Sequence, residues 1–190
     1  MLPVVALVGR PNVGKSTLFN VLTRSRDAIV ADMPGVTRDR PSGVCRSGDR
    51  PFVVVDTGGL SGVEDTMDVL TARQVRLAIE EANVLVFVVD ARDGLLPQDY
   101  VILGELRRSG KPIVAVVNKT DGLDEQAVLA EFSAFGIGTT LPLSAAHNRG
   151  TDDLIRVLLP ILPAEEEGSV EADSEDGTIR VAIVGRPNAG

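Results

Sequence analysis

The stretch GRPNVGKS, at residues 9–16, limits what this chain can fold into more than any other part of it. It fits the pattern G-x-x-x-x-G-K-[ST], with the apolar run 4–8 before it and a helical stretch, residues 16–22, after it. A glycine-rich turn between a buried strand and a helix directs backbone amides and the positive end of the helix at a phosphate. The stretch therefore predicts a phosphate-binding loop in an α/β protein.

The residues of this loop have separate roles in that prediction. Gly9 and Gly14 let the backbone curl so that amides face the β- and γ-phosphates. Lys15 is the candidate catalytic cation for the same oxygens, and the Ser16 hydroxyl is a candidate ligand of Mg²⁺. The alternative is a glycine-rich turn with an exposed lysine. The predicted nucleotide-binding residues here are Gly9, Arg10, Pro11, Asn12, Val13, Gly14, Lys15, Ser16 and Thr17.

A second motif, DTGG at residues 56–59, directly follows the apolar run 52–55. An aspartate at the end of a strand can hold Mg²⁺, usually through water, so Asp56 is the second candidate metal ligand. Gly59 is a candidate catalytic residue because its amide can approach the γ-phosphate with no side chain in between. The predicted nucleotide-binding residues of this segment are Asp56, Thr57, Gly58, Gly59 and Leu60.

The motif NKTD, at residues 118–121, ends another apolar run and indicates which base is bound. A carboxylate at Asp121 can accept hydrogen bonds from guanine N1–H and from its exocyclic amine. Adenine would leave a buried Asp121 unpaired, which can discriminate between the bases by about 10⁴-fold. A polar turn after a strand is the alternative. The predicted base-binding residues of the motif are Asn118, Lys119, Thr120 and Asp121.

LSAA, at residues 143–146, follows the last short apolar run. Its small residues allow backbone amides to approach the base, so Ser144, Ala145 and Ala146 are also candidates. The adjacent His147 is the only histidine of the chain. With no cysteine or second histidine nearby it is expected to be an exposed loop residue rather than a metal ligand.

PGVTRD, at residues 34–39, lies in a long stretch without regular periodicity. Connections of this length are usually functional or disordered. The Thr37 hydroxyl is the third candidate ligand of Mg²⁺, and its amide would bind the γ-phosphate, so the segment is predicted to be a switch. Arg10 and Arg38 are nearby cations that we expect to pair with acidic residues or partners rather than to act in catalysis.

Strand and helix patterns alternate through residues 1–162, which predicts an α/β fold with a doubly wound, mostly parallel six-stranded sheet flanked by helices. Together with the phosphate-loop pattern, this predicts a P-loop NTPase fold. SGVCRSGDR, at residues 42–50, is expected to supply an antiparallel strand that turns through 47–49. The other expected strands are Val4–Val8, Phe52–Val55, Val84–Val89, Ile113–Val117 and Leu141–Leu143. The expected helices are Ser16–Leu22, Asp68–Ala82, Asp99–Arg108, Glu125–Phe135 and Asp152–Leu159.

A second copy of the loop sequence predicts the organisation of the chain. Residues 3–14 and 179–190 share eight of twelve residues, and the segment between the domain and the second copy is acidic. We expect a first G domain at 1–162, a flexible linker at 163–178 and the start of a second G domain at 179–190. The linker holds much of the net charge of −8, which therefore says little about partners. The single cysteine and the lack of a membrane-length apolar run predict a cytoplasmic protein with no membrane partner.

With GRPNVGKST, PGVTRD, DTGG and NKTD in this order, the chain resembles Era-like GTPases, and the second GRPN is similar to the bacterial tandem GTPase family called EngA or Der. The resemblance implies GTP and GDP as ligands, Mg²⁺, GTP hydrolysis and a role in assembly of the large ribosomal subunit. It also implies a second G domain and a KH-like domain. Contacts with the large ribosomal subunit or its rRNA are expected mainly from those regions, which are mostly missing from this sequence. The alternative is a module that senses GTP or GDP without turnover. A P-loop ATPase conflicts with NKTD.

Two residues bear on how hydrolysis would be catalysed. Leu60 stands where Ras-type enzymes have a glutamine that orients the attacking water, so a slow intrinsic rate is expected. Asn12 matches an asparagine that binds K⁺ in potassium-activated relatives, and the resemblance implies K⁺ held by Asn12 and carbonyls of 29–37. The alternative is that Asn12 closes the turn through a local side-chain bond.

Overall fold

The structure is a computed structural model that describes residues 2–23, 41–58 and 75–164. These residues contain a six-stranded sheet in the order β2-β3-β1-β4-β5-β6. The strands are β1 (Val4–Val8), β2 (Ser42–Cys45), β3 (Phe52–Asp56), β4 (Val84–Asp90), β5 (Ile113–Asn118) and β6 (Thr140–Pro142). The helices are α1 (Lys15–Thr23), α3 (Pro97–Arg108), α4 (Glu125–Phe132) and α5 (Thr151–Ile161), and residues 75–81 are also helical.

All strand pairs are parallel except β2 with β3, which is antiparallel with Cys45 opposite Phe52. The expected α/β sheet and its one antiparallel strand are therefore confirmed. Every residue of β1 and β4 is buried, as expected for continuous apolar runs at the centre of a parallel sheet. Cys45 is buried in β2.

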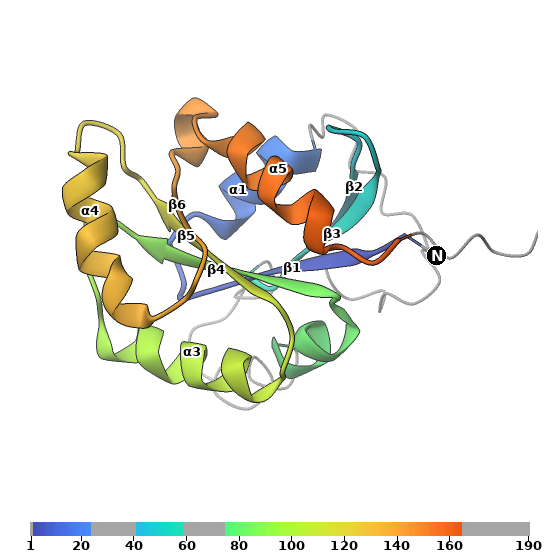
Figure 1. The fold of residues 1–190 in the computed structure, drawn as a ribbon, viewed down its shortest axis with the longest axis horizontal. Helices are drawn as coiled ribbons and strands as arrows, with labels where there is room; N and C mark the ends of the chain where they lie inside the picture. Colours follow the sequence, from blue (N-terminus) through green and yellow to red (C-terminus); the bar gives the residue numbers. More distant parts are fainter. Residues whose placement is uncertain (1, 24–40, 59–74, 165–190) are drawn as a thin grey trace, which may run out of the picture.

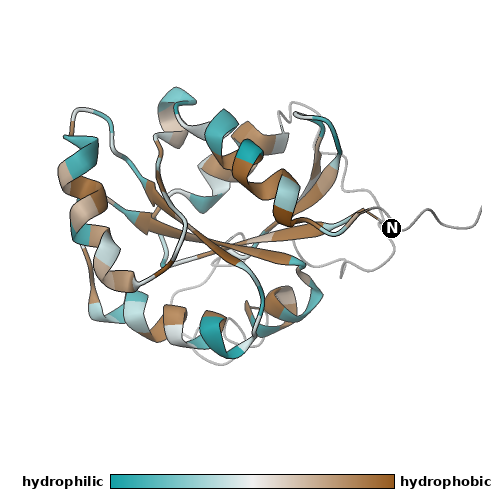
Figure 2. Cartoon of the chain, viewed as in Figure 1, coloured by the Kyte–Doolittle hydropathy of each residue, from teal (hydrophilic) through white to brown (hydrophobic). Residues whose placement is uncertain are grey.

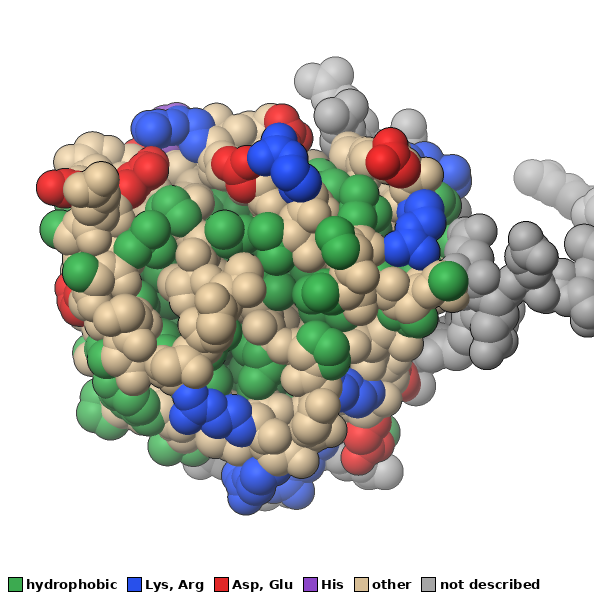
Figure 3. Space-filling view, viewed as in Figure 1, with side chains coloured by type: hydrophobic (Ala, Val, Ile, Leu, Met, Phe, Trp, Pro, Cys, Tyr) green, Lys and Arg blue, Asp and Glu red, His purple; other side chains and the backbone are tan. Residues whose placement is uncertain are grey.

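Helices cover both faces of the sheet, and each face has its own apolar core (Figure 1). On one face α1 and α5 pack through residues such as Leu18 and Leu158. On the other, residues 75–81, α3 and α4 contribute Ile79, Leu103 and Phe132 among others. Figure 2 shows the same division, with hydrophobic strands between helices that have hydrophilic outer surfaces. On the face seen in Figure 3, acidic and basic side chains both lie around the rim, and hydrophobic side chains and uncharged atoms fill the centre.

Some helix ends differ from the sequence-based expectations. The helix expected at 125–135 ends at Phe132, and Ser133–Phe135 form a 3₁₀ turn closed by Gly136 at φ +59°. The Ser133 hydroxyl donates to Ala130 O and supports this break. α3 begins two residues early because Pro97 fits the first helical turn, where its missing N–H has no partner to lose.

The parallel strands end at one edge of the sheet, and this edge positions the site. The register places Leu7 of β1 opposite Asp56 of β3, and Asp90 of β4 opposite Asn118 of β5. The loops that leave these strands are therefore neighbours, as expected for ligand sites of open α/β sheets. Within the three described ranges no helix has the length and apolar character to cross a membrane.

Several expectations concern residues outside the described ranges and stay predictions. They are the switch expected at 34–39 with Thr37 and Arg38, the roles of Gly59 and Leu60, the part of the expected helix at 68–74, the linker expected from 165 onward and the second loop copy at 179–190.

Candidate functional site

The phosphate loop leaves β1 and enters α1 in a conformation that requires glycine. Gly14 has φ +95°, and a Cβ there would lie 2.2 Å from Asn118 Nδ2. A Cβ on Gly9 would lie 2.1 Å from Val88 O, so the loop passes close to β4. Asn12 also has positive φ, at +64°. Both glycines predicted to shape the loop are therefore needed for close backbone packing.

The Lys15 side chain points back into the loop. It is buried, and its Nζ donates to Gly9 O at 2.9 Å and to Arg10 O at 2.6 Å. Burial lowers the pKa of Lys15; the Asp56 carboxylate opposes this shift and the Arg10 charge adds to it. The exposed-lysine alternative is wrong, because Lys15 is buried and its ammonium donates to two carbonyls of the loop.

A surface cavity of about 430 Å³ lies over the loop. Its walls are formed by the loop, the first turn of α1 and the residue two positions after β3: Pro11, Asn12, Gly14, Lys15, Ser16, Thr17 and Gly58. The positive end of α1 and the Lys15 ammonium would both attract an anion bound there. The cavity is therefore suited to a phosphate group.

Asp56 ends β3 beside this cavity and is buried. Its Oδ1 accepts from the Gly58 amide at 2.8 Å, while the Thr57 hydroxyl donates to Leu7 O at 2.8 Å. The Thr57 side chain therefore joins β3 to β1. One carboxylate with the exposed hydroxyl of Ser16 fits Mg²⁺, which keeps several waters and binds phosphate oxygens. No cluster of three acidic, cysteine or histidine residues occurs in the described part of the chain.

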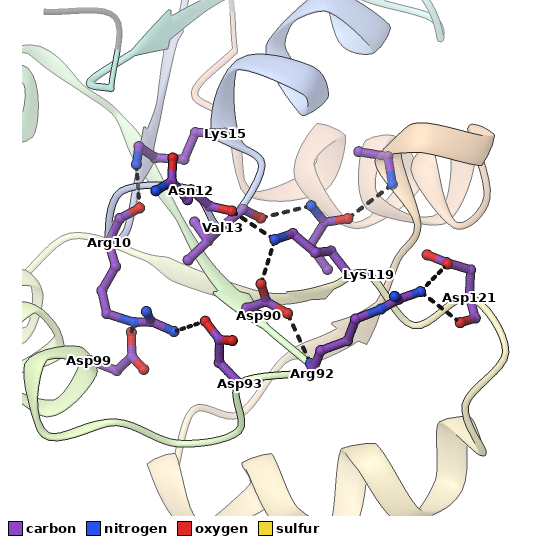
Figure 4. Close-up of polar contacts among 12 residues, drawn as sticks. Arg10, Asn12, Val13, Lys15, Asp90, Arg92, Asp93, Asp99, Lys119 and Asp121 are labelled. Atoms are coloured by element: carbon purple, nitrogen blue, oxygen red, sulfur yellow. Dashed lines mark hydrogen bonds and ion pairs between the residues drawn. The ribbon is translucent and has the colours of Figure 1, made fainter. Parts of the chain in front are cut away.

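NKTD is attached directly to the phosphate loop (Figure 4). The buried Asn118 donates from Nδ2 to Val13 O at 2.8 Å and accepts at Oδ1 from the Ala145 amide at 2.9 Å. Lys119 donates to Asn12 O at 2.8 Å. Asn118 therefore joins three segments that are distant in sequence.

The segment 143–146 lies against NKTD. Thr120 donates to Leu143 O from both its amide and its hydroxyl, at 3.2 and 3.1 Å. The Ser144 hydroxyl donates to Asp121 Oδ1 at 3.0 Å. Ala145 is buried and Ala146 is exposed. The structure thus brings the candidate base-binding residues of both segments together.

Asp121 differs from the expectation of a buried carboxylate, because its side chain is 28% exposed. Its Oδ2 lies 2.5 Å from Arg92 Nη2, and the exposed His147 lies 4.0 Å away. The hydrogen bond from Ser144 lowers the pKa of Asp121, and the charges of Arg92 and His147 act in the same direction. The carboxylate is therefore ionised at neutral pH and able to accept from a base.

Sequence analysis missed the acidic and basic partners of the motif residues. Asp90 Oδ2 pairs with Lys119 at 2.6 Å, and Arg10 Nε donates to the buried Asp99 at 2.8 Å (Figure 4). Arg10 also pairs with Asp93 at 3.3 Å, so the expectation that it pairs with acids is confirmed. Asp90 ends an apolar run as Asp56 does, so the same sequence signal could have identified it as a candidate.

A phosphate loop, a carboxylate at the end of β3 and an NKTD motif joined to that loop define a P-loop NTPase of the G-domain type. The family model described as 50S ribosome-binding GTPase matches residues 4–119, and the chain belongs to this family. Within it, the chain is 56% identical over 190 residues to GTPase Der of Thioalkalivibrio sulfidiphilus. The match covers all of this chain and 41% of that relative, so the chain spans about two fifths of its length.

Solved structures show the same fold. Era of Aquifex aeolicus bound to GDP and aluminium fluoride is 32% identical, with a TM-score of 0.70, and the match covers 87% of this chain and 58% of Era. Era in complex with MgGDPNP and a segment of 16S ribosomal RNA gives a TM-score of 0.71 at 32% identity and the same coverage.

Proposed function

We propose that this chain binds GTP and GDP with Mg²⁺ and hydrolyses GTP to GDP and phosphate. The main support is the connection between its two recognition motifs, Asn118 Nδ2 to Val13 O and Lys119 Nζ to Asn12 O, both at 2.8 Å. Because of these bonds, one rigid network carries the carboxylate of Asp121 and the ammonium of Lys15. A ligand with a purine at one end and phosphates at the other needs this arrangement.

Each end of the site has a separate chemical role. Lys15 and the loop amides would bind the β- and γ-phosphate oxygens and stabilise the charge that develops as the γ-phosphoryl group passes to water. Ser16, Asp56 and Thr37 would hold Mg²⁺, which neutralises charge on the same oxygens. The amide of Gly59 would bind the γ-phosphate. Thr37 and Gly59 belong to the segments that would change between the GTP and GDP states.

Nucleotide competition tests the choice of base. A fluorescent GDP analogue should be displaced by unlabelled GDP at concentrations about 10³-fold or more below those of ADP, because adenine cannot pair with Asp121. Asp121→Ala should remove most of this preference. Asp152→Ala, an exposed carboxylate in the first turn of α5, is the matched control. Displacement by ADP and GDP at similar concentrations would contradict the assignment of guanine.

Single-turnover hydrolysis separates an enzyme from a nucleotide sensor. We expect slow production of phosphate from GTP by the native chain and still slower production by Thr37→Ala. If the native chain produced phosphate no faster than Thr37→Ala, the result would favour a nucleotide sensor without turnover.

Potassium dependence concerns Asn12. Its side chain is exposed at the edge of the cavity and forms no hydrogen bond to any described residue, which supports an ion-binding role over a turn-closing one. We propose that Asn12 binds K⁺ beside the β- and γ-phosphates and that turnover is faster in KCl than in NaCl. Equal rates at matched ionic strength would exclude this role.

The ribosomal role is proposed from the family. The matching family model is described as ribosome-binding, and the Era neighbour was solved with ribosomal RNA. We propose that the GTP and GDP states of this domain are read during assembly of the large ribosomal subunit, in a protein with a second G domain. Rates of nucleotide exchange measured with and without large ribosomal subunits test this proposal. Identical rates would show that the subunit does not affect the nucleotide site and would contradict it.

A further inference from the structure

Both carboxylate oxygens of Asp121 have protein donors. Ser144 Oγ donates to Oδ1 at 3.0 Å, and Arg92 Nη2 donates to Oδ2 at 2.5 Å. The same Arg92 nitrogen lies 3.4 Å from the main-chain oxygen of Asp121. A single nitrogen of Arg92, Nη2, thus contacts both the carboxylate and the main-chain oxygen of Asp121 (Figure 4).

Arg92 is itself held by the site. Its amide donates to Asp90 Oδ1 at 2.9 Å, and the other oxygen of Asp90 pairs with Lys119 at 2.6 Å. Lys119 in turn donates to Asn12 O of the phosphate loop. A single buried carboxylate therefore fixes the start of the Arg92 segment relative to both NKTD and the phosphate loop.

The number of lone-pair positions on the Asp121 carboxylate determines how many hydrogen bonds it can still accept from a ligand. An ionised carboxylate has about four lone-pair positions, two on each oxygen. The side chains of Ser144 and Arg92 take one position on each oxygen, so neither oxygen is saturated by these two donors. Two parallel donors, such as N1–H and the exocyclic amine of guanine, require one position on each oxygen of a carboxylate in a fixed orientation.

We propose that Arg92 is a positioning residue of the base site, which holds the Asp121 carboxylate in the rotation that accepts both donors of guanine. This inference rests on the proposed guanine nucleotide binding and adds a residue that sets its specificity. Because two bonds tolerate rotation of the carboxylate less than one bond does, Arg92 matters most for a base with two donors.

The test compares GDP with inosine diphosphate, whose base keeps N1–H but lacks the exocyclic amine. In Arg92→Ala we expect the dissociation constant for GDP to rise by about two- to fivefold, the range for loss of an exposed ion pair. The dissociation constant for inosine diphosphate should rise less. Arg92→Lys should restore GDP affinity, because the contact uses one nitrogen and not the two-pronged guanidinium.

Arg108→Ala is the matched control, since Arg108 is an exposed arginine of α3 whose only ion pair among the described residues is with Glu105. An equal loss for both nucleotides in Arg92→Ala would show a simple effect of charge and overturn the proposal. Unchanged or tighter GDP binding by Arg92→Ala would also overturn it. The Arg92 guanidinium would then either have no effect on the base site or compete with the base for the Asp121 carboxylate. Failure of the native chain to prefer GDP to ADP would instead contradict the proposed function.

Discussion

Asp121 lies among hydrogen-bond donors rather than in an apolar pocket, and this sets its charge. The Ser144 hydroxyl makes the largest contribution to the lowered pKa, ahead of the charges of Arg92 and His147. A lowered pKa in the folded state means that stabilisation by the ionised group is present above the ordinary aspartate pKa and is lost as the pH falls through the folded value. The Asp121 carboxylate is therefore ionised throughout the neutral range.

Ser144→Ala should raise the pKa of Asp121 toward its ordinary value, because the hydrogen bond from the hydroxyl to Oδ1 stabilises the ionised form more than the protonated form. The acid loss of GDP binding should then begin at a higher pH than in the native chain. NMR titration of the Asp121 carboxyl carbon measures the pKa directly. Ser133→Ala, whose hydroxyl donates to Ala130 O away from the site, should leave it unchanged.

At the scale of elements, the phosphate loop is held from two sides. Asn118 of β5 holds its second half at Val13, and Arg10 joins its first half to Asp99 in the first turn of α3. Asp99 is fully buried and also accepts from the Leu96 amide at the start of the helix, whereas Asp93 is 52% exposed. The position of the loop therefore depends on α3 as well as on the sheet.

Asp99→Ala should destabilise the fold by about 3 kcal/mol, because it leaves a buried arginine without its main partner. Asp93→Ala removes an exposed partner of the same arginine and should cost about 1 kcal/mol or less. Urea denaturation of both variants provides the comparison. Similar costs for the two would contradict the view that the buried pair holds the loop to α3.

Gly14→Ala should destabilise the fold by about 2 kcal/mol and abolish GDP binding, through positive φ and the displaced Asn118 side chain. Gly104→Ala provides the contrast. Gly104 lies within α3, and a methyl group added there would meet no atom within 4 Å, so alanine should stabilise the helix by up to about 1 kcal/mol. Thermal unfolding midpoints should move in opposite directions, and GDP binding should persist only in Gly104→Ala.

At the scale of the whole molecule, one sheet with a core on each face carries every described part of the site. A ligand that bridges loops after β1 and β5 binds only the folded chain, so it stabilises the whole unit. GDP at a hundred times its dissociation constant should raise the free energy of unfolding by about 2.7 kcal/mol. ADP at the same concentration should have no comparable effect. Thermal unfolding with each nucleotide measures the difference, and equal shifts would show that the base is not read.

The sequence alone determined the fold class, the order of the strands along the chain and the motif residues at their ends. It did so because burial on both faces produces continuous apolar runs, and parallel strands bring their following loops to one edge. Asp56 and Asn118 could be selected on this ground, because each ends such a run, whereas Lys15 was selected by the phosphate-loop pattern and Asn12 by the resemblance to potassium-activated relatives. Helix ends were less well determined, as at Phe132, because the 3₁₀ turn after it depends on local hydroxyl bonding.

Only the tertiary structure decided the partners of the charged residues. Arg10 and Asp99 are 89 positions apart, and Arg92 and Asp121 are 29 apart, with no periodicity that links either pair. Long side chains reach across loops whose paths depend on packing, so sequence spacing does not determine where their charges meet. The same packing places a single nitrogen of Arg92 on Asp121, which makes a residue outside every motif part of the candidate site.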